Sequence, residues 1–149
     1  MMKPFPILLL VVLCALVTCS QPEENLDVFT VAEVYQTERD EGNNIDSPSV
    51  WHGPHGEHWL IATAKEGNAL FVYNAANGEF ITKVGESGTQ PGQLARPNGV
   101  FVIDDLAIVV ERDNRRVQVF DLPEFNSLGF IGDTLLIYPY GLFVHKLEN

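Results

Sequence analysis

Short apolar runs separated by polar turns dominate the chain from about residue 44 onward. The runs WLIATA, LFVY, LAIVVE and VQVF each last only a few residues, and turns rich in Gly, Asn or Asp divide them. Runs of this length between turn residues predict β-strands. Beyond the N-terminal leader, no segment has the long apolar stripe of an amphipathic helix. The pattern therefore predicts an all-β protein.

The same order of strands and turns occurs twice along the chain. Residues 48–86 and 97–133 each begin with a proline and a short strand, followed by a polar turn and a second strand. A charged connection, a third strand, a turn and a fourth strand complete each copy. A third copy opens at residues 138–144, and the prolines at positions 48, 97 and 139 give spacings of 49 and 42 residues. Four short strands in about 40–50 residues are typical of a β-propeller blade.

We therefore expect four-stranded antiparallel β-propeller blades at residues 44–92 and 93–135, and the start of a third blade at residues 136–149. Propellers usually have about four blades or more, because closure of the ring protects the blade edges. Two blades and a fraction leave apolar faces and strand edges uncovered. We expect either that the sequence is the N-terminal part of a larger ring or that another subunit supplies the missing blades.

Residues 1–19 have the features of an export signal. Lys3 precedes an apolar run at residues 7–17, which is too short to cross a bilayer as a helix but suits a secretory signal. The run ends in a segment that resembles a bacterial lipobox, with Cys19 as the lipidated residue. Thr18 departs from the Gly, Ala or Ser usual there, so a plain cleaved signal is the alternative. We expect an exported protein, either a periplasmic or outer-membrane lipoprotein held by its lipid anchor or a secreted protein.

Residues 20–43 are polar and acidic, and we expect a linker with one possible strand at residues 27–36. Both cysteines, Cys14 and Cys19, lie in the leader, so the folded part is expected to have no disulfide. The formal net charge is −11 at pH 7. Phosphate contacts with nucleic acid need clustered Lys and Arg, so no nucleic-acid partner is expected. Acidic side chains do suit hard divalent cations such as Ca²⁺.

Both copies place a cation and then a carboxylate directly after the second strand. Lys65 and Glu66 align with Arg112 and Asp113 at a constant offset of 47 residues. One explanation is a repeated structural turn, in which each cation pairs with a neighbouring carboxylate. The other is a functional rim, because radial repetition would bring the two cations side by side. Since Lys and Arg bind phosphate oxygens, this second explanation predicts a site for a phosphorylated small molecule.

The same rim would carry carboxylates. Glu66, Glu111 and Asp113 would lie near the two cations and could hold Ca²⁺, which neutralises phosphate and activates a water molecule. The sequence contains no Ser-His-Asp order, HExxH helix, P-loop or CxxC. The familiar nucleophilic, zinc and nucleotide chemistries therefore have no support in the sequence.

The first copy resembles the opening blade of the β-propeller phytases. That family begins with a D-D-P-A-I/V-W motif, and this chain has DSPSVW at residues 46–51, followed by Thr63, Lys65 and the strand LFVY. In the next family segment an Arg after the second strand contacts substrate phosphate, and Arg112 stands at that place. The resemblance covers residues 43–144 and implies calcium-dependent release of phosphate from phytate or a similar molecule.

Carried over to this sequence, the resemblance implies that Lys65 and Arg112 bind substrate phosphate and that Asp46 lies near the calcium cluster. Two positions depart from the family pattern. The second acid of the motif is Ser47 here, and the segment at residues 97–100 keeps an amide but no acid. The remaining metal ligands of the family come from later blades. The resemblance therefore predicts a phytase-like hydrolase in a full-length ring rather than activity of this chain alone.

The second copy resembles the blades of NHL-repeat propellers. GQLARPNGVFV followed by ERDNRRVQVFD matches their Pro-x-Gly strand start and their D-x-x-N/R-x-R-V/I-Q-V/I-F strand. This resemblance implies that Asp113 and Arg116 stabilise the blade and that the protein is a secreted binding scaffold without catalysis. Both resemblances predict a propeller, but they assign opposite roles to the charged connection.

Aromatic and histidine residues are concentrated near the first hairpin. Trp51 and Trp59 are expected in the core of a blade. His52, His55 and His58 lie within seven residues of one another and suggest metal binding. They fall in a Gly-Pro-Gly hairpin without a Cys or acid at zinc spacing, so we expect an exposed turn there.

Overall fold

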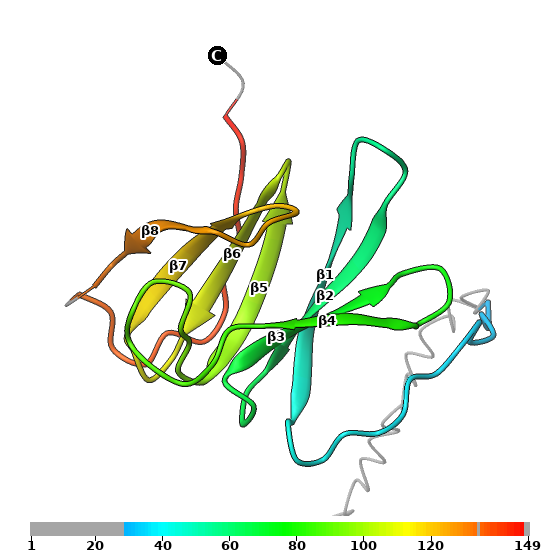
Figure 1. Cartoon of the computed structure of the whole chain (residues 1–149), viewed down its shortest axis with the longest axis horizontal. Coiled ribbons are helices and arrows are strands. Elements are labelled where there is room, and N and C mark those ends of the chain that lie inside the picture. The colour runs from blue at the N-terminus through cyan, green and yellow to red at the C-terminus, as the bar shows by residue number, and fades with distance from the viewer. Residues whose placement is uncertain (1–28, 134, 148–149) are drawn as a thin grey trace, which may run out of the picture. The chain divides into compact units, whose positions relative to one another are not determined.

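The computed structural model describes residues 29–133 and 135–147 (Figure 1). These residues form two four-stranded antiparallel sheets, in each of which the strands lie in the order of the sequence. The first sheet contains β1 (Ile45–His52), β2 (His58–Ala64), β3 (Ala69–Asn74) and β4 (Phe80–Val84). The second contains β5 (Pro97–Ile103), β6 (Leu106–Glu111), β7 (Arg116–Asp121) and β8 (Ser127–Ile131). The all-β class and the four-stranded antiparallel sheets are confirmed.

The structure holds no helix, within the ranges it describes, that is long and apolar enough to cross a membrane. The leader at residues 1–19, with the predicted lipidation site Cys19, lies outside the described residues. Export and lipidation therefore stay predictions from the sequence.

The turns of the two sheets repeat each other in backbone conformation. Asn68 and Arg115, which are 47 residues apart, both have a positive φ, of 48° and 55°, where the second hairpin of each sheet turns. Gly78 follows Asn77 in the third turn of the first sheet and has a φ of 75°. Asn and Gly adopt this left-handed conformation at low cost. The repeat seen in the sequence is thus also a repeat of the backbone from the second strand onward.

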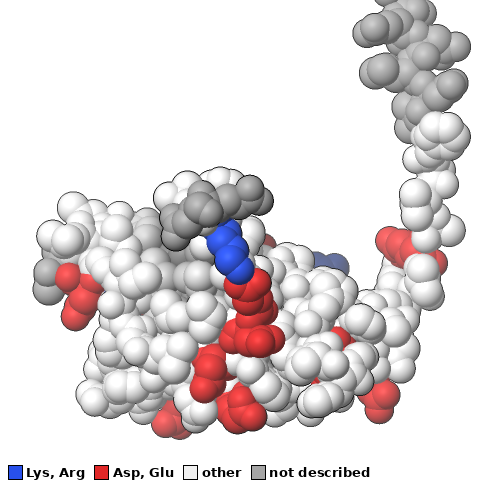
Figure 2. All heavy atoms as spheres, turned by 90° about the horizontal axis from the view of Figure 1, so that it is seen from above, with Lys and Arg blue, Asp and Glu red and all other residues white. Residues whose placement is uncertain are grey.

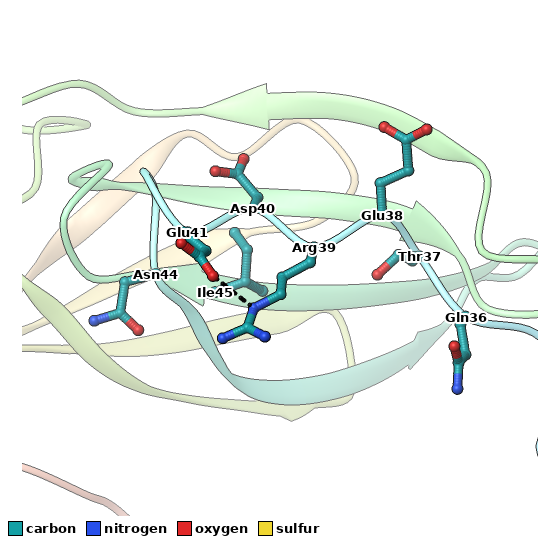
Figure 3. A pocket seen from close by; sticks show the side chains of 8 residues that line it. All are labelled: Gln36, Thr37, Glu38, Arg39, Asp40, Glu41, Asn44 and Ile45. Atoms are coloured by element: carbon teal, nitrogen blue, oxygen red, sulfur yellow. Dashed lines mark ion pairs between the residues drawn. The ribbon is translucent and has the colours of Figure 1, made fainter.

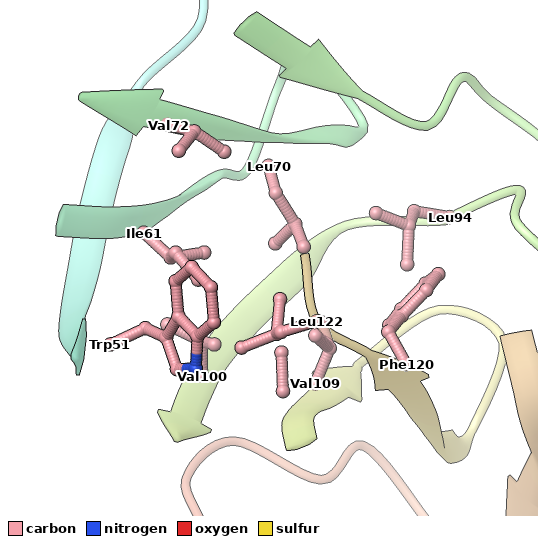
Figure 4. Packing of buried hydrophobic residues seen from close by; sticks show 10 residues of the cluster. Trp51, Ile61, Leu70, Val72, Leu94, Val100, Val109, Phe120 and Leu122 are labelled. Carbon is pink, nitrogen blue, oxygen red and sulfur yellow. The ribbon is translucent and has the colours of Figure 1, made fainter. Parts of the chain in front are cut away.

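The two sheets pack face to face over one hydrophobic core (Figure 4). The first sheet contributes Trp51, Ile61, Leu70 and Val72, and the second contributes Val100, Ala107, Val109 and Phe120, while Leu94 and Leu122 come from the connections. At one end of this interface, β1 and β5 lie side by side. There Ser47 Oγ donates to Asn98 O (2.8 Å), and Ser49 Oγ accepts from Val102 N (3.0 Å). The predicted burial of Trp51 is confirmed, because only 1% of its surface is exposed.

The alignment of the two copies by their prolines is wrong. Ile45 pairs with Ala64 across the first hairpin, whereas Pro97 pairs with Glu111 across the corresponding hairpin of the second sheet. Pro97 is therefore equivalent to Ile45 and not to Pro48. The cause is the first hairpin loop, residues 53–57, which is longer than its counterpart at residues 104–105.

The strand predicted at residues 27–36 is not formed in the described part, residues 29–36. From Glu33 onward the chain belongs to the same compact unit as the sheets. Tyr35, for example, donates its hydroxyl hydrogen to Ala75 O (2.8 Å) in the turn after β3. A strand needs a neighbour for its backbone hydrogen bonds, and residues 29–36 pair with no strand of the two sheets.

The predicted opening strand of the third copy is also not formed, since residues 138–144 have no regular structure. The segment nevertheless runs beside β5. Tyr140 O lies 3.2 Å from where a Cβ on Gly99 would be, and the Phe143 ring meets that of Phe101 edge-on at 5.9 Å. Tyr138 has a φ of 50°, close to the 49° of Arg96 just before β5. The two segments thus share a left-handed residue before a proline, but residues 138–144 pair with no strand among the described residues.

Candidate functional site

Lys65 lies at the end of β2, where the backbone leaves the first sheet. Its N–H donates to Asn44 O (3.1 Å), and its ammonium group pairs with the carboxylate of Asp46 on β1. Lys65 Nζ also donates to Tyr140 Oη (3.2 Å) and lies 5.3 Å from the centre of that ring. The hydrogen bond to Asp46 raises the pKa of Lys65, against the opposing effect of burial. Lys65 is therefore a charged group with partners on two sides.

Arg112 occupies the equivalent position after β6. Its N–H donates to Arg96 O (3.1 Å), which repeats the bond from Lys65 to Asn44. Its guanidinium lies 5.4 Å from the ring centre of Tyr138, and Arg115 lies at the same distance from that ring. The side chain of Arg112 is 38% exposed and so is accessible to a ligand.

The segment containing Tyr138 and Tyr140 therefore passes both predicted phosphate ligands, contacting Arg112 with the first tyrosine and Lys65 with the second. Sequence analysis did not connect these tyrosines with the cations. The only signal was their position on either side of Pro139, at the start of the third copy. We call Lys65, Arg112, Tyr138 and Tyr140 the rim cluster.

The predicted metal ligands have separate partners. Asp46 is paired with Lys65, and Glu66 accepts from the Arg96 guanidinium at 2.6 Å. Asp113 is half exposed, with its carboxylate 3.8 Å from Arg112. In the ranges that the structure describes, no three His, Cys, Asp or Glu residues are grouped so that they could hold a metal ion. The four carboxylates named for calcium thus do not form a cluster.

Glu111, the fourth of these carboxylates, is completely buried at the end of β6. Its Oε1 accepts hydrogen bonds from Arg116 Nε (2.6 Å) and Gln118 Nε2 (3.0 Å). Its Oε2 accepts from Asn114 Nδ2 (2.5 Å) and from the backbone N–H of Ala95 (3.1 Å). A buried carboxylate is stable only when its oxygens are satisfied in this way. The donors here are all groups of the protein.

The partners of Glu111 also hold the connection between the two sheets. Arg116 donates to Thr89 O (2.7 Å) and Gln93 O (3.2 Å), and Asn114 donates to Gly88 O (2.8 Å). Gln118 donates to Gln93 O (3.0 Å) and accepts from Gly92 N (2.8 Å). We call Glu111, Asn114, Arg116 and Gln118 the buried network. It fixes the loop between β4 and β5 by bonding to backbone groups that would otherwise need water.

The first sheet has no such network. In place of the Glu111–Arg116 pair across β6 and β7 it has Ala64 opposite Ala69 across β2 and β3. The alignment of charged residues seen in the sequence thus combines two different features. Lys65 and Arg112 are equivalent cations after the second strand of each sheet, with side chains 13% and 38% exposed, whereas Glu111 and Arg116 belong to the interior of the second sheet only.

The structure also has an open cleft of about 890 Å³, lined by Gln36–Glu41 with Asn44 and Ile45 (Figure 3). An ion pair of 3.1 Å joins Arg39 to Glu41 along this segment. A second cleft, of about 640 Å³, lies between the same segment and the aromatic residues Phe71, Tyr73 and Phe80. Neither cleft contains a residue of the rim cluster. On the face drawn in Figure 2, acidic side chains lie at several places and few Lys or Arg are visible.

Comparisons with known proteins add little to this geometry. No protein-family model matches the chain. No curated protein matches it. Among solved structures, it is similar to a Bacteroides fragilis NCTC 9343 protein described provisionally as exported, with a TM-score of 0.46 and 15% sequence identity. That match covers 63% of this chain and 26% of the other, so the chain spans about a quarter of that protein's length.

Proposed function

We propose that the protein is a β-propeller-type binding scaffold without catalysis, in which the two sheets are adjacent blades. Three features support this arrangement. Each sheet is a four-stranded meander, the two share one core, and β1 and β5 lie side by side as the inner strands of neighbouring blades would.

The observation that carries the scaffold function is the buried network. The charged stretch that resembles NHL-repeat blades uses Glu111, Arg116 and Gln118 to hold the loop between the sheets. This is the structural role that the resemblance implies for Arg116. Asp113 is half exposed and contributes no bond to the network, so its part in blade stability stays a prediction.

The surface available for binding is the rim cluster. Arg112 is partly exposed, and Tyr138 beside it is 56% exposed, so both can reach a ligand. A guanidinium next to an aromatic ring suits a small anion, for instance a phosphorylated molecule, which accepts charge-assisted hydrogen bonds while the ring excludes water from one side. A phytate-like molecule is the ligand we would try first.

A second candidate is the calcium-dependent phytase-like phosphohydrolase. The observation in its favour is that Lys65 and Arg112, the two residues carried over as phosphate ligands, have the same backbone environment after equivalent strands and meet one segment of chain. The calcium cluster that this activity requires would need carboxylates in addition to Asp46, Glu66, Glu111 and Asp113, which form no cluster.

We also propose that further strands, from the same polypeptide or another subunit, cover the outer faces of the two sheets. Val50 and Phe80 on the first sheet are 41% and 52% exposed, and Ile131 on the second is 59% exposed. Apolar residues exposed in groups on sheets usually mark a surface that a partner covers.

One experiment separates the two functions. Phytate binding and calcium-dependent phosphate release are measured on the same preparations of the full-length protein and of its Lys65→Met and Arg112→Met variants. Lys83→Met, which removes a cation from β4 outside the rim cluster, is the matched control. Loss of one charged hydrogen bond should weaken binding by roughly tenfold to a hundredfold.

For the scaffold we expect phytate binding without release of phosphate. Lys65→Met and Arg112→Met should both weaken this binding, and Lys83→Met should not. Release that depends on Ca²⁺ and is lost in both rim variants would establish the hydrolase instead. Binding that Lys83→Met weakens as much as Arg112→Met does would show that the rim cluster is not the binding site.

A further inference from the structure

The hairpin between β1 and β2 brings two histidines together where its strands enter the loop. His52 and His58 are register partners across the strands, and their Nδ1 atoms lie 2.7 Å apart. The two rings meet edge-on, with centres 4.9 Å apart and planes at 72°. Both side chains are exposed to solvent.

Two imidazole nitrogens at this distance cannot both carry a proton. In the absence of other partners, one Nδ1–H donates to the lone pair of the other Nδ1. If neither nitrogen carries the proton, two lone pairs converge on one point at the surface. This is the arrangement of two cis ligands of a transition metal, for which neutral imidazole is a preferred donor.

We propose that His52 and His58 form a two-histidine binding site for a borderline divalent transition metal: Cu²⁺, Ni²⁺ or Zn²⁺. Metal–nitrogen bonds of about 2.0–2.1 Å place two tetrahedral ligands roughly 3.3 Å from each other. The two Nδ1 atoms therefore need to separate by only a fraction of an ångström, which exposed side chains do by small torsional changes. Affinity should follow the order of these ions on nitrogen ligands, with Cu²⁺ bound most tightly.

The backbone around His52 and His58 already has the conformation that metal binding requires. The next register pair inward is Trp51 with Trp59, whose rings pack at 4.8 Å and anchor the hairpin in the core. At the tip, Gly53 N–H donates to Glu57 O (2.8 Å). Because the strands are held from both sides, metal binding does not have to order the hairpin.

The local charge also favours a cation. The carboxylate of Glu57 accepts from the backbone N–H of His55 (2.9 Å) within the same loop. Ca²⁺, in contrast, prefers oxygen ligands, so this site is different from the calcium site predicted by the phytase resemblance.

The test is a calorimetric titration of the untagged chain, expressed with its own leader, with Cu²⁺ and with Zn²⁺ in a non-chelating buffer. We expect His52→Ala and His58→Ala each to weaken one binding event by roughly a hundredfold, because two linked ligands bind far more tightly than one. His55→Ala and His145→Ala, which alter the other two of the four histidines, are the matched controls and should leave that event unchanged.

The thiols of Cys14 and Cys19 can bind the same metals. The proposed site is therefore identified by a binding event that is weakened in His52→Ala and unchanged in His55→Ala. For Cu²⁺, electron paramagnetic resonance should show two coordinated nitrogens in the chain and fewer in His58→Ala. Because both histidines are exposed, thermal unfolding without metal should be the same in all variants; His58→Asn serves as a second variant if His58→Ala unfolds early. Metal affinity that is equal in the chain and in both site variants would overturn the proposal, as would an equal loss in His55→Ala.

Discussion

Replacing Arg116 by Met would test whether the buried network holds the two sheets together. The side chain of Arg116 is 6% exposed, and that of Glu111, to which it donates at 2.6 Å, is completely buried. Met is similar in length but donates no hydrogen bond. The substitution therefore leaves the Glu111 carboxylate buried beside an apolar group, and it also removes the donors to Thr89 O and Gln93 O.

The expected loss follows from the type of interaction. Removing one partner of a buried ion pair costs about 3–5 kcal/mol in the free energy of unfolding, because the other charge stays buried without its counter-charge. The total stability of a domain is only about 5–15 kcal/mol. For the compact unit Glu33–Asn149, an unfolding entropy of about 2.1 cal/mol/K per residue converts this loss into a decrease in Tm of roughly 10–20 °C.

Urea unfolding followed by tryptophan fluorescence measures the change, since the buried Trp51 reports on the core between the sheets. Arg96→Met is the matched control. It makes the same substitution in a pair with Glu66 whose side chains are 30% and 51% exposed, and such surface pairs contribute about 0–1 kcal/mol. If Arg116→Met destabilises the protein no more than Arg96→Met, the reasoning about the buried network is refuted.

Three further predictions concern the core, a turn and the rim. Leu70→Ala should lower the free energy of unfolding by about 2–5 kcal/mol in urea, because the side chain is completely buried between the sheets. Gly78→Ala should cost about 1–2 kcal/mol by the same assay, since φ is +75° and the new Cβ would lie 2.5 Å from the Tyr35 ring; an unchanged midpoint would contradict this. The pKa of Lys65 is raised by Asp46, so its stabilising charge is complete below the unfolded-state pKa of about 10.4 and is lost as the pH rises through the folded-state pKa. Thermal unfolding as a function of pH should therefore show that the stability difference between the chain and Lys65→Met decreases at alkaline pH.

The sequence was sufficient to predict the strands and most of the turns. Apolar runs such as LFVY and VQVF bounded by Asn, Asp and Gly leave little choice of secondary structure, and the offset of 47 residues correctly aligned the last three strands of the two copies. The prolines were misleading because a hairpin loop can lengthen on the surface without changing the sheet. The strand predicted at residues 138–144 failed for a different reason: an alternating pattern is necessary for a strand, but hydrogen bonding to a neighbour completes it.

The roles of the charged and polar side chains depended on the tertiary structure. Glu111 and Asp113 look alike in the sequence, yet one is buried among four donors and the other is half exposed, because only one faces the loop between the sheets. His52 and His58 are separated by five residues, and only the register of the hairpin places their nitrogens 2.7 Å apart. The amino-acid pattern specifies where strands form through local periodicity. Which side chains meet depends on register, loop length and the packing of one sheet on another, and these are properties of the folded chain.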